Sequence, residues 1–203
     1  SRGGHVGLLF IRDYPELVSG LIITGSSGLY EKSMIGDGYP KRGNYEYFYK
    51  NSGLQNHSVL YRRPLGSLLN EEIFIDPNTF SEDGTVALRG IYFSEDYKTA
   101  SYMITEGGSD WRKAITIGVE DKSIVEDTLK NIKFSGISWK GNDGYFYSSY
   151  TVPKGESQLS SKTQLHTVYD HKVGTPQSKD VFIFGGEKQP NRYIGGYVTE
   201  DQN

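Results

Sequence analysis

The chain has 203 residues and a net charge of −3, with 25 glycines, 16 tyrosines and no cysteine. The absent cysteine excludes a disulfide framework and a cysteine-based metal site. The negative net charge gives no sign of the basic surface that binds nucleic acid. No apolar run approaches the ~18 residues of a membrane-spanning helix. Alanine, the strongest helix former, occurs three times and aromatic residues favour strands, so the composition predicts a mainly β protein.

Residues 1–44 predict a short α/β segment. The apolar spacing within residues 3–13 suits an amphipathic helix that ends before Pro15. The continuous apolar run 21–25 suits a strand that is covered on both faces. Ser1 is not an initiator methionine and no secretory signal pattern follows it, so we expect the chain to be cut from a longer one.

From about Tyr45 onward, the pattern changes to a period of two residues. Turn signals such as Asp83-Gly84 and Gly185-Gly186 separate short alternating or aromatic runs, which is typical of a sandwich, barrel or propeller. The predicted strands are 45–49, 90–93, 98–104, 114–119, 137–139, 145–147 and 181–184.

An internal repeat favours the propeller. A strand, an acidic turn and a second strand are predicted from Gly90, from Gly136 and from Gly195, with starts 46 and 59 residues apart. A period of about 40–50 residues with four strands per unit is typical of a β-propeller, and the polar stretch 153–162 would hold an insertion that lengthens the second spacing. We therefore predict about three four-stranded blades. The blade at Tyr45 lacks a repeat-like first strand. Either the N-terminal segment supplies this strand or the strand is missing.

The residue types predict no metal site and no cofactor. His166 and His171 are five positions apart, so on a strand they face opposite sides. His5 and His57 are expected to be an ordinary packing residue and a solvated turn residue. The acidic turns 81–84 and 94–96 lack the spacing of a calcium loop. We expect them to be structural turns, in which the aspartate bonds the backbone two residues ahead.

Residues 45–203 resemble the N-terminal β-propeller of the prolyl oligopeptidase family of serine peptidases. The matching stretches occur in the family's order and are 47–61, 75–88, 108–111, 168–169 and 174–180. The resemblance implies a propeller that covers the active site of an endopeptidase cleaving short peptides after proline and restricts substrate size. It implies two partners, a C-terminal α/β-hydrolase catalytic domain and short proline-containing peptides, and no nucleic acid or membrane.

Residues 1–46 resemble a different family, the small bacterial α/β-hydrolases. The stretch 1–8 is similar to the end of a nucleophile elbow entered at its serine, and 14–18, 20–30 and 38–47 continue the likeness. The two resemblances overlap at residues 41–47, which suggests a chimera of two genes joined there by recombination or by sequence assembly.

We assign residues 1–44 to a hydrolase fragment and 45–203 to the partial propeller. Ser1 would be a vestigial elbow serine. The positioning strand and the oxyanion loop of that fold lie before the serine, and propeller-like sequence follows it. The chain by itself is therefore predicted to be inactive, because a catalytic triad acts as a unit.

Phe134 is the candidate substrate contact. Lys133-Phe134-Ser135 matches a family motif whose phenylalanine lines the pocket between propeller and catalytic domain. The alternative is that Phe134 only packs at the start of a blade strand. For the whole chain, the alternative function is a non-catalytic propeller that binds proteins, and the downstream gene sequence would discriminate the two. The cytoplasm and the bacterial periplasm both suit a chain without cysteine.

Overall fold

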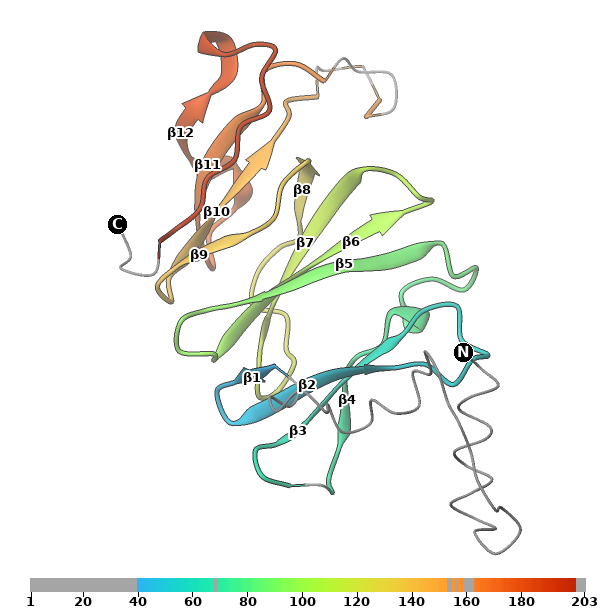
Figure 1. The fold of residues 1–203 in the computed structure, drawn as a ribbon. Coiled ribbons are helices and arrows are strands. Elements are labelled where there is room, and N and C mark those ends of the chain that lie inside the picture. Colours follow the sequence, from blue (N-terminus) through green and yellow to red (C-terminus); the bar gives the residue numbers. More distant parts are fainter. Residues whose placement is uncertain (1–39, 68, 153–154, 156, 159–162, 200–203) are drawn as a thin grey trace, which may run out of the picture. The chain divides into compact units, whose positions relative to one another are not determined.

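A computed structural model describes residues 40–67, 69–152, 155, 157–158 and 163–199. The predicted helix and strand of the N-terminal segment lie outside these residues, as do Ser1, His5 and most of the predicted insertion. The described chain is mainly β, as predicted, with three short 3-10 helices (Figure 1). Its strands are β1 (Lys41–Arg42), β2 (Tyr45–Lys50), β3 (Val59–Pro64), β4 (Glu72–Ile75), β5 (Val86–Phe93), β6 (Thr99–Glu106), β7 (Trp111–Gly118), β8 (Leu129–Lys133), β9 (Ser138–Lys140), β10 (Gly144–Ser149), β11 (Thr167–Lys172) and β12 (Val181–Gly185). The 3-10 helices are η3 (Pro77–Thr79), η4 (Gln177–Lys179) and η5 (Gly186–Lys188). Within the described residues, no helix is long and apolar enough to cross a membrane.

The strands form antiparallel sheets that divide into three groups of four. Blade I is the sheet β1-β2-β3-β4, and the second sheet runs β12-β11-β10-β8-β7-β6-β5 with β9 paired to β10. Strands β8 and β10 share one residue pair, Ser149 with Ile132, so the second sheet consists of blade II (β5–β8) and blade III (β9–β12) joined at one corner. This arrangement is that of a partial propeller.

The first strand of blade I is short but present. Lys41 and Arg42 form β1, which pairs with β2 across a turn in which Gly43 has a φ of +59°. Glycine tolerates this left-handed conformation because it has no Cβ. This strand lies on the N-terminal side of the boundary predicted at residue 45.

The first two copies of the repeat pack against each other. The Trp139 indole donates to the carbonyl of Tyr92 at 3.0 Å, and the amide of Asp96 donates to the side chain of Asn142 at 2.8 Å. The strand predicted for the third copy is wrong, because residues 192–199 contain no regular strand. This segment instead runs beside β9, where the amide of Val198 donates to the Ser138 hydroxyl at 2.8 Å.

Aromatic and aliphatic side chains fill two cores between the blades. The first joins Tyr47, Leu60, Phe74 and Ile75 of blade I to Ala100, Ile115 and Ile117 of blade II. The second joins Met103, Ala114, Leu129 and Ile132 of blade II to Ile137, Tyr145 and Tyr147 around blade III. Strand alternation lets β6 and β7 supply both cores, and aromatic rings lie in each of them.

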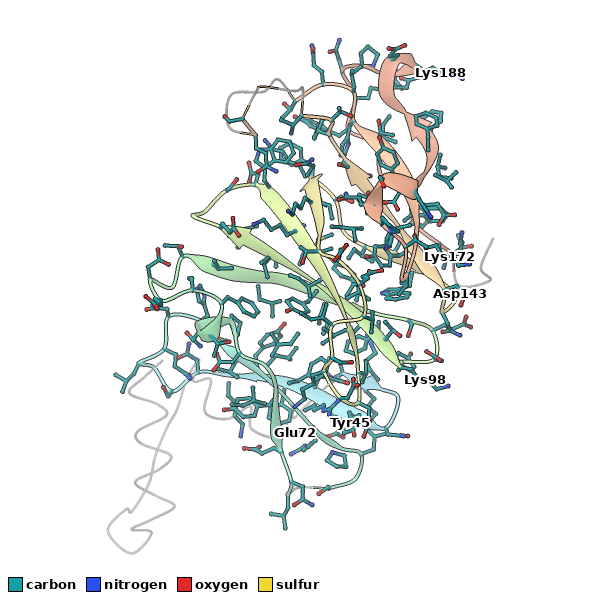
Figure 2. The ribbon with its side chains drawn as sticks, turned by 180° about the vertical axis from the view of Figure 1, so that it is seen from behind. Tyr45, Glu72, Lys98, Asp143, Lys172 and Lys188 are labelled. Atoms are coloured by element: carbon teal, nitrogen blue, oxygen red, sulfur yellow. The ribbon has the colours of Figure 1, made fainter. Side chains whose placement is uncertain are left out.

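A buried arginine joins blade I to the connection between β7 and β8. Arg62 is 2% exposed, and its guanidinium donates to the carbonyls of Val119 and Glu120 and to the Glu72 carboxylate. It also lies over the Tyr45 ring, 4.3 Å from the centroid. Figure 2 labels Tyr45 and Glu72 in this region. Because every contact is charge-assisted or aromatic, the desolvated cation is well compensated.

Candidate functional site around Phe134

Successive antiparallel strands run in opposite directions, so their connections gather at two ends of each blade. The tight turns 43–44, 94–98 and 141–143 mark the hairpin end. Contacts between turns confirm this grouping, since the amide of Glu95 donates to the Gly141 carbonyl at 3.2 Å. Lys98 and Asp143 lie near this end in Figure 2. The connections β2–β3, β6–β7 and β10–β11, and the exits of β4, β8 and β12, lie at the opposite end, which we call the loop end.

Phe134 emerges at the loop end directly after β8. Its φ is +51°, a region that residues other than glycine seldom adopt, and its side chain is 46% exposed. The next residue is fixed from two strands. The Ser135 carbonyl accepts from the Arg112 guanidinium, and its hydroxyl accepts from the Ser148 amide, both at 2.8 Å. These bonds hold the backbone in its strained conformation, so the exposed position of Phe134 is imposed by the fold.

Phe134 belongs to an aromatic cluster drawn from several connections. Its ring meets Tyr193 edge to face with centroids 5.0 Å apart, and Tyr150 at 6.5 Å. The Lys133 ammonium lies 5.1 Å from the Phe134 centroid and 4.9 Å from that of Trp111. Edge-to-face pairs present both ring edges and electron-rich faces. The cluster can therefore contact an apolar or aromatic group beside one positive charge.

A buried histidine lies beneath this cluster. His166 is fully buried, and its ring stacks on Tyr150 with centroids 4.4 Å apart. Its Nε2 lies 2.9 Å from the Lys133 carbonyl, and its Nδ1 accepts from the Ile194 amide at 2.9 Å. Burial lowers the pKa of His166 and outweighs the opposing effect of the carbonyl. The ring is therefore neutral at neutral pH.

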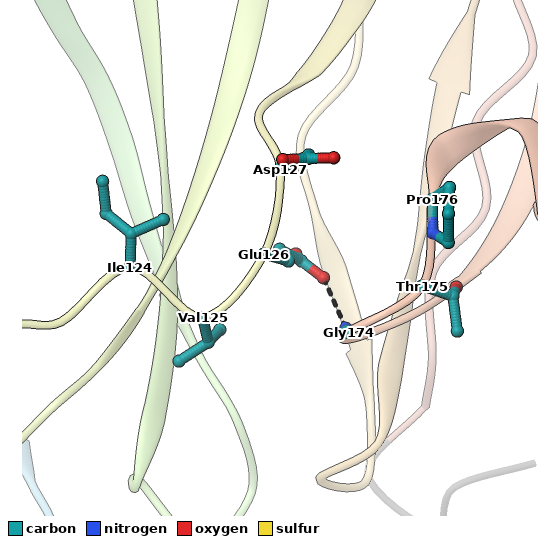
Figure 3. A pocket seen from close by; sticks show the side chains of 7 residues that line it. All are labelled: Ile124, Val125, Glu126, Asp127, Gly174, Thr175 and Pro176. Atoms are coloured by element: carbon teal, nitrogen blue, oxygen red, sulfur yellow. Dashed lines mark hydrogen bonds between the residues drawn. The ribbon is translucent and has the colours of Figure 1, made fainter.

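A second polar centre lies near the hairpin end, between blades II and III. A pocket of about 470 Å³ adjoins it and is lined by residues 124–127 and 174–176. Figure 3 shows these residues and the hydrogen bond between Glu126 and Gly174. One oxygen of Glu126 accepts from the Gly174 amide at 2.8 Å and lies 2.9 Å from His171 Nε2, while the other accepts from the Tyr145 hydroxyl at 3.1 Å. Asp180 contacts the other ring nitrogen of His171 at 2.7 Å.

This cluster is an ion triad. Burial disfavours a charged His171, but bonds to Asp180 and Glu126 outweigh it and raise the pKa of His171 to about 9. Both ring nitrogens are occupied, so His171 is neither a free base nor a metal ligand. No group of three or more metal-binding side chains is found in the described part of the chain. The triad joins the β7–β8 connection of blade II to blade III.

The predicted residues have different outcomes. Phe134 is at the loop end, whereas Ser1 lies outside the described residues. His166 and His171 do have separate surroundings, and His57 is half-buried, with Nε2 2.8 Å from the Gly84 carbonyl. The acidic turns are structural as expected, because Asp83 and Asp96 accept from the amides of Thr85 and Lys98.

Sequence reasoning missed Tyr150, Tyr193 and His166 as neighbours of Phe134. Tyr150 and His166 flank the connection between β10 and β11, and Tyr193 follows the last 3-10 helix. These residues carry no common motif. A correct blade topology placing the β10–β11 connection beside the exit of β8 is the signal that would have brought them together.

Comparison with protein families gives a match over residues 35–203 to the prolyl oligopeptidase N-terminal β-propeller domain. The chain belongs to this family. The match starts ten residues before the boundary predicted from the sequence, and it includes β1. This family match gives no support for the α/β-hydrolase fragment predicted over residues 1–44.

Individual relatives agree with this assignment. A prolyl endopeptidase of Elizabethkingia miricola is 52% identical over 162 residues, covering 80% of this chain and 23% of the relative. Prolyl oligopeptidase A of Galerina marginata is 33% identical over 185 residues, covering 77% of this chain and 25% of the relative. The chain thus spans about a quarter of the length of these relatives.

Solved structures show the same fold. A chain from a study of two prolyl endopeptidases superimposes with a TM-score of 0.69 at 36% identity, covering 81% of this chain and 23% of that one. Prolyl oligopeptidase B of Galerina marginata, bound to a 35-residue hydrolysis and macrocyclisation substrate, gives a TM-score of 0.69 at 25% identity, covering 78% and 24%.

Proposed function

We propose that this chain supplies part of the propeller of a prolyl endopeptidase, with its loop end turned toward a catalytic domain and the peptide substrate. The observation that carries the proposal is the position of Phe134. A strained backbone holds a half-exposed aromatic ring at the loop end, beside Tyr193 and one ammonium group. Apolar and aromatic surfaces of this kind suit the side chains next to a proline in a short peptide.

Cleavage itself is assigned to a separate α/β-hydrolase domain. The polar groups that contact the described histidines are backbone groups for His57 and His166 and carboxylates for His171. A serine nucleophile needs a histidine base within hydrogen-bond reach. In this proposal the propeller limits access to the active site and contributes contacts such as Phe134.

The experiment compares the complete reading frame with the present chain. The complete protein should react with a fluorophosphonate probe and hydrolyse a chromogenic peptide after proline, whereas the 203-residue chain should do neither. Labelling of Ser1 together with turnover by the chain alone would overturn this division of roles. A complete protein that binds other proteins but cleaves no proline peptide would favour the alternative, a non-catalytic binding module.

We also propose that the hydrolase-like residues before the propeller come from an unrelated gene. The support is the resemblance of residues 1–46, in which Ser1 takes the place of the elbow serine. Sequencing one uninterrupted DNA molecule across codons 30–60 tests this. A reading frame with a full hydrolase upstream supports a real fusion, two separate genes support an assembly artefact, and propeller sequence continuing upstream contradicts the chimera.

A further inference from the structure

The hydrogen bonds of His166 define one form of its ring. The backbone N–H of Ile194 can only donate, so Nδ1, 2.9 Å away, must be an unprotonated acceptor. The carbonyl of Lys133 can only accept, so Nε2, also 2.9 Å away, must carry the proton. Both contacts require the same neutral tautomer. A protonated ring would direct a second N–H at the N–H of Ile194.

The two backbone groups that His166 holds are the immediate neighbours of the exposed aromatic pair. Lys133 precedes Phe134, and Ile194 follows Tyr193. These residues are about sixty positions apart in the sequence and meet edge to face, with ring centroids at 5.0 Å. Tyr193 is 70% exposed, so its own packing does little to fix it. The buried imidazole therefore links the two segments that carry the pair.

Other contacts hold residues 185–190 against Leu165 and His166. The His166 carbonyl accepts from the Gly186 amide at 3.1 Å, and the Leu165 amide donates to the Pro190 carbonyl at 2.9 Å. A Cβ on Gly185 would lie 2.3 Å from the His166 carbonyl oxygen, so the backbones are in close contact there. Segment 185–194 is thus held against His166 at both ends. The titratable groups in ring contact with His166 are those of Tyr150 and Tyr193. The Lys133 ammonium lies over the Trp111 and Phe134 rings.

We propose that His166 is a positioning residue, which as the neutral Nε2–H tautomer holds Phe134 and Tyr193 together as one surface for an apolar group of a peptide. The use of that surface rests on the proposed function, whereas the positioning role does not. Protonation of the ring breaks the bond to Ile194 and releases the Tyr193 segment. The aromatic surface is therefore intact at neutral pH and separates when the ring is protonated.

Two variants of His166 each remove one of its two hydrogen bonds. His166→Asn places an oxygen near the position of Nδ1, so it keeps an acceptor for Ile194 but loses the donor to Lys133. His166→Gln places an amide nitrogen near Nε2, so it keeps the donor and loses the acceptor. Because a net hydrogen bond corresponds to roughly a tenfold change in an equilibrium, Ile194 amide exchange should quicken about tenfold in His166→Gln and stay near wild type in His166→Asn. His57→Asn is the control, because His57 lies in the β2–β3 connection of blade I and its ring contacts the Gly84 carbonyl rather than this segment.

NMR on the 203-residue chain provides the decisive readouts. Long-range ¹H–¹⁵N correlations should show the Nε2–H tautomer of His166 at pH 7, and nuclear Overhauser contacts should join the Phe134 and Tyr193 rings. Acidification should remove those contacts and the protection of Ile194 in wild type. A charged ring or the Nδ1–H tautomer at pH 7 would overturn the proposal, even if both variants fail to fold. So would folded variants that keep all ring contacts and wild-type exchange.

A peptide titration separates this role from the proposed function. The probe is the blocked tripeptide acetyl-Phe-Gly-Pro-amide, added to the wild-type chain and to His166→Gln. Shifts of the Phe134 and Tyr193 ring signals that weaken in the variant support both ideas. If the tautomer and ring contacts are as expected but the peptide moves neither ring, the positioning role stands and the substrate-facing surface is contradicted.

Discussion

Neutralising Glu126 tests whether the buried ion triad holds blades II and III together. In Glu126→Gln, His171 loses one of two anionic partners, and the Tyr145 hydroxyl and Gly174 amide must share one acceptor oxygen. The side chains of Glu126 and His171 are 2% and 0% exposed. Breaking a buried pair by removing one partner costs about 3–5 kcal/mol. Because glutamine has nearly the same shape as glutamate, we expect a loss of unfolding free energy near the lower end of this range.

The matched control makes the same substitution at an exposed pair. Glu106 pairs with Lys113 at 2.5 Å, with side chains 55% and 36% exposed. Exposed pairs contribute roughly 0.2–1 kcal/mol, so Glu106→Gln should cost no more than this. Urea unfolding at pH 7, followed by circular dichroism, measures both losses. Equal losses in the two variants would refute the triad as a joint between blades.

The same triad predicts how stability depends on pH. The pKa of His171 is raised in the folded state, from 6.5 to about 9, so its contribution is fully present below pH 6.5. It is lost as pH rises through about 9, by on the order of 3 kcal/mol, because one pKa unit is about 1.4 kcal/mol. Glu126→Gln should flatten this fall. A wild-type stability that is constant over that range would contradict a charged His171.

Three further perturbations address the fold, the site and the exposed edge. Gly144→Ala should lower the free energy of unfolding by at least about 3 kcal/mol, because its Cβ would lie 2.2 Å from the His171 carbonyl oxygen. The control Gly141→Ala meets open space at a φ of +60° and should lower it by about 1–2 kcal/mol. Equal losses in urea melts would count against the register of β10 and β11. Phe134→Ala in the complete protein should raise KM for a proline peptide about tenfold with little change in kcat, since burying an aromatic ring is worth roughly 1.5–3 kcal/mol; an unchanged KM would show that Phe134 only packs. Phe182→Lys should reduce self-association in sedimentation experiments, because residues 181–184 of β12 are 46–58% exposed and open apolar edges aggregate; unchanged association would place the contact elsewhere.

The strands predicted from the sequence are those whose alternation is carried by apolar or aromatic residues. Strands β2, β6, β7 and β10 are of this kind, because their buried positions include Tyr47, Ala100, Ile115 and Tyr145. Strands β3 and β11 were missed since their buried positions include Arg62 and His171. Their polarity hides the period, and acceptors on both the same blade and the β7–β8 connection explain their burial.

Strand β8 was missed for a different reason. Leu129 and Ile132 are both buried but three positions apart, and Asn131 between them has a φ of +60°. This irregularity breaks the period of two that a sequence reading relies on. The strand predicted at Gly195 is also wrong, because the described residues 195–199 form no regular strand although the sequence there resembles that of the other copies.

The candidate site was predictable only in part. Phe134 came from a family motif, and its exposure depends on hydrogen bonds from Arg112 and Ser148 to Ser135 that the sequence does not reveal. Tyr150, Tyr193 and His166 join it through connections whose path is set by the order of strands in blades II and III. Pairing of this kind is a tertiary property, so spacing along the chain gave no sign of it.

Steady-state hydrolysis by the complete reading frame that contains this chain tests the central claim most directly. The substrates are a short chromogenic peptide with proline before the scissile bond, the same peptide with alanine there, and an intact folded protein. The account predicts cleavage of the proline peptide, little cleavage of the alanine peptide, and none of the folded protein. Equal cleavage of both peptides, or no cleavage of either, would contradict a role in a prolyl endopeptidase.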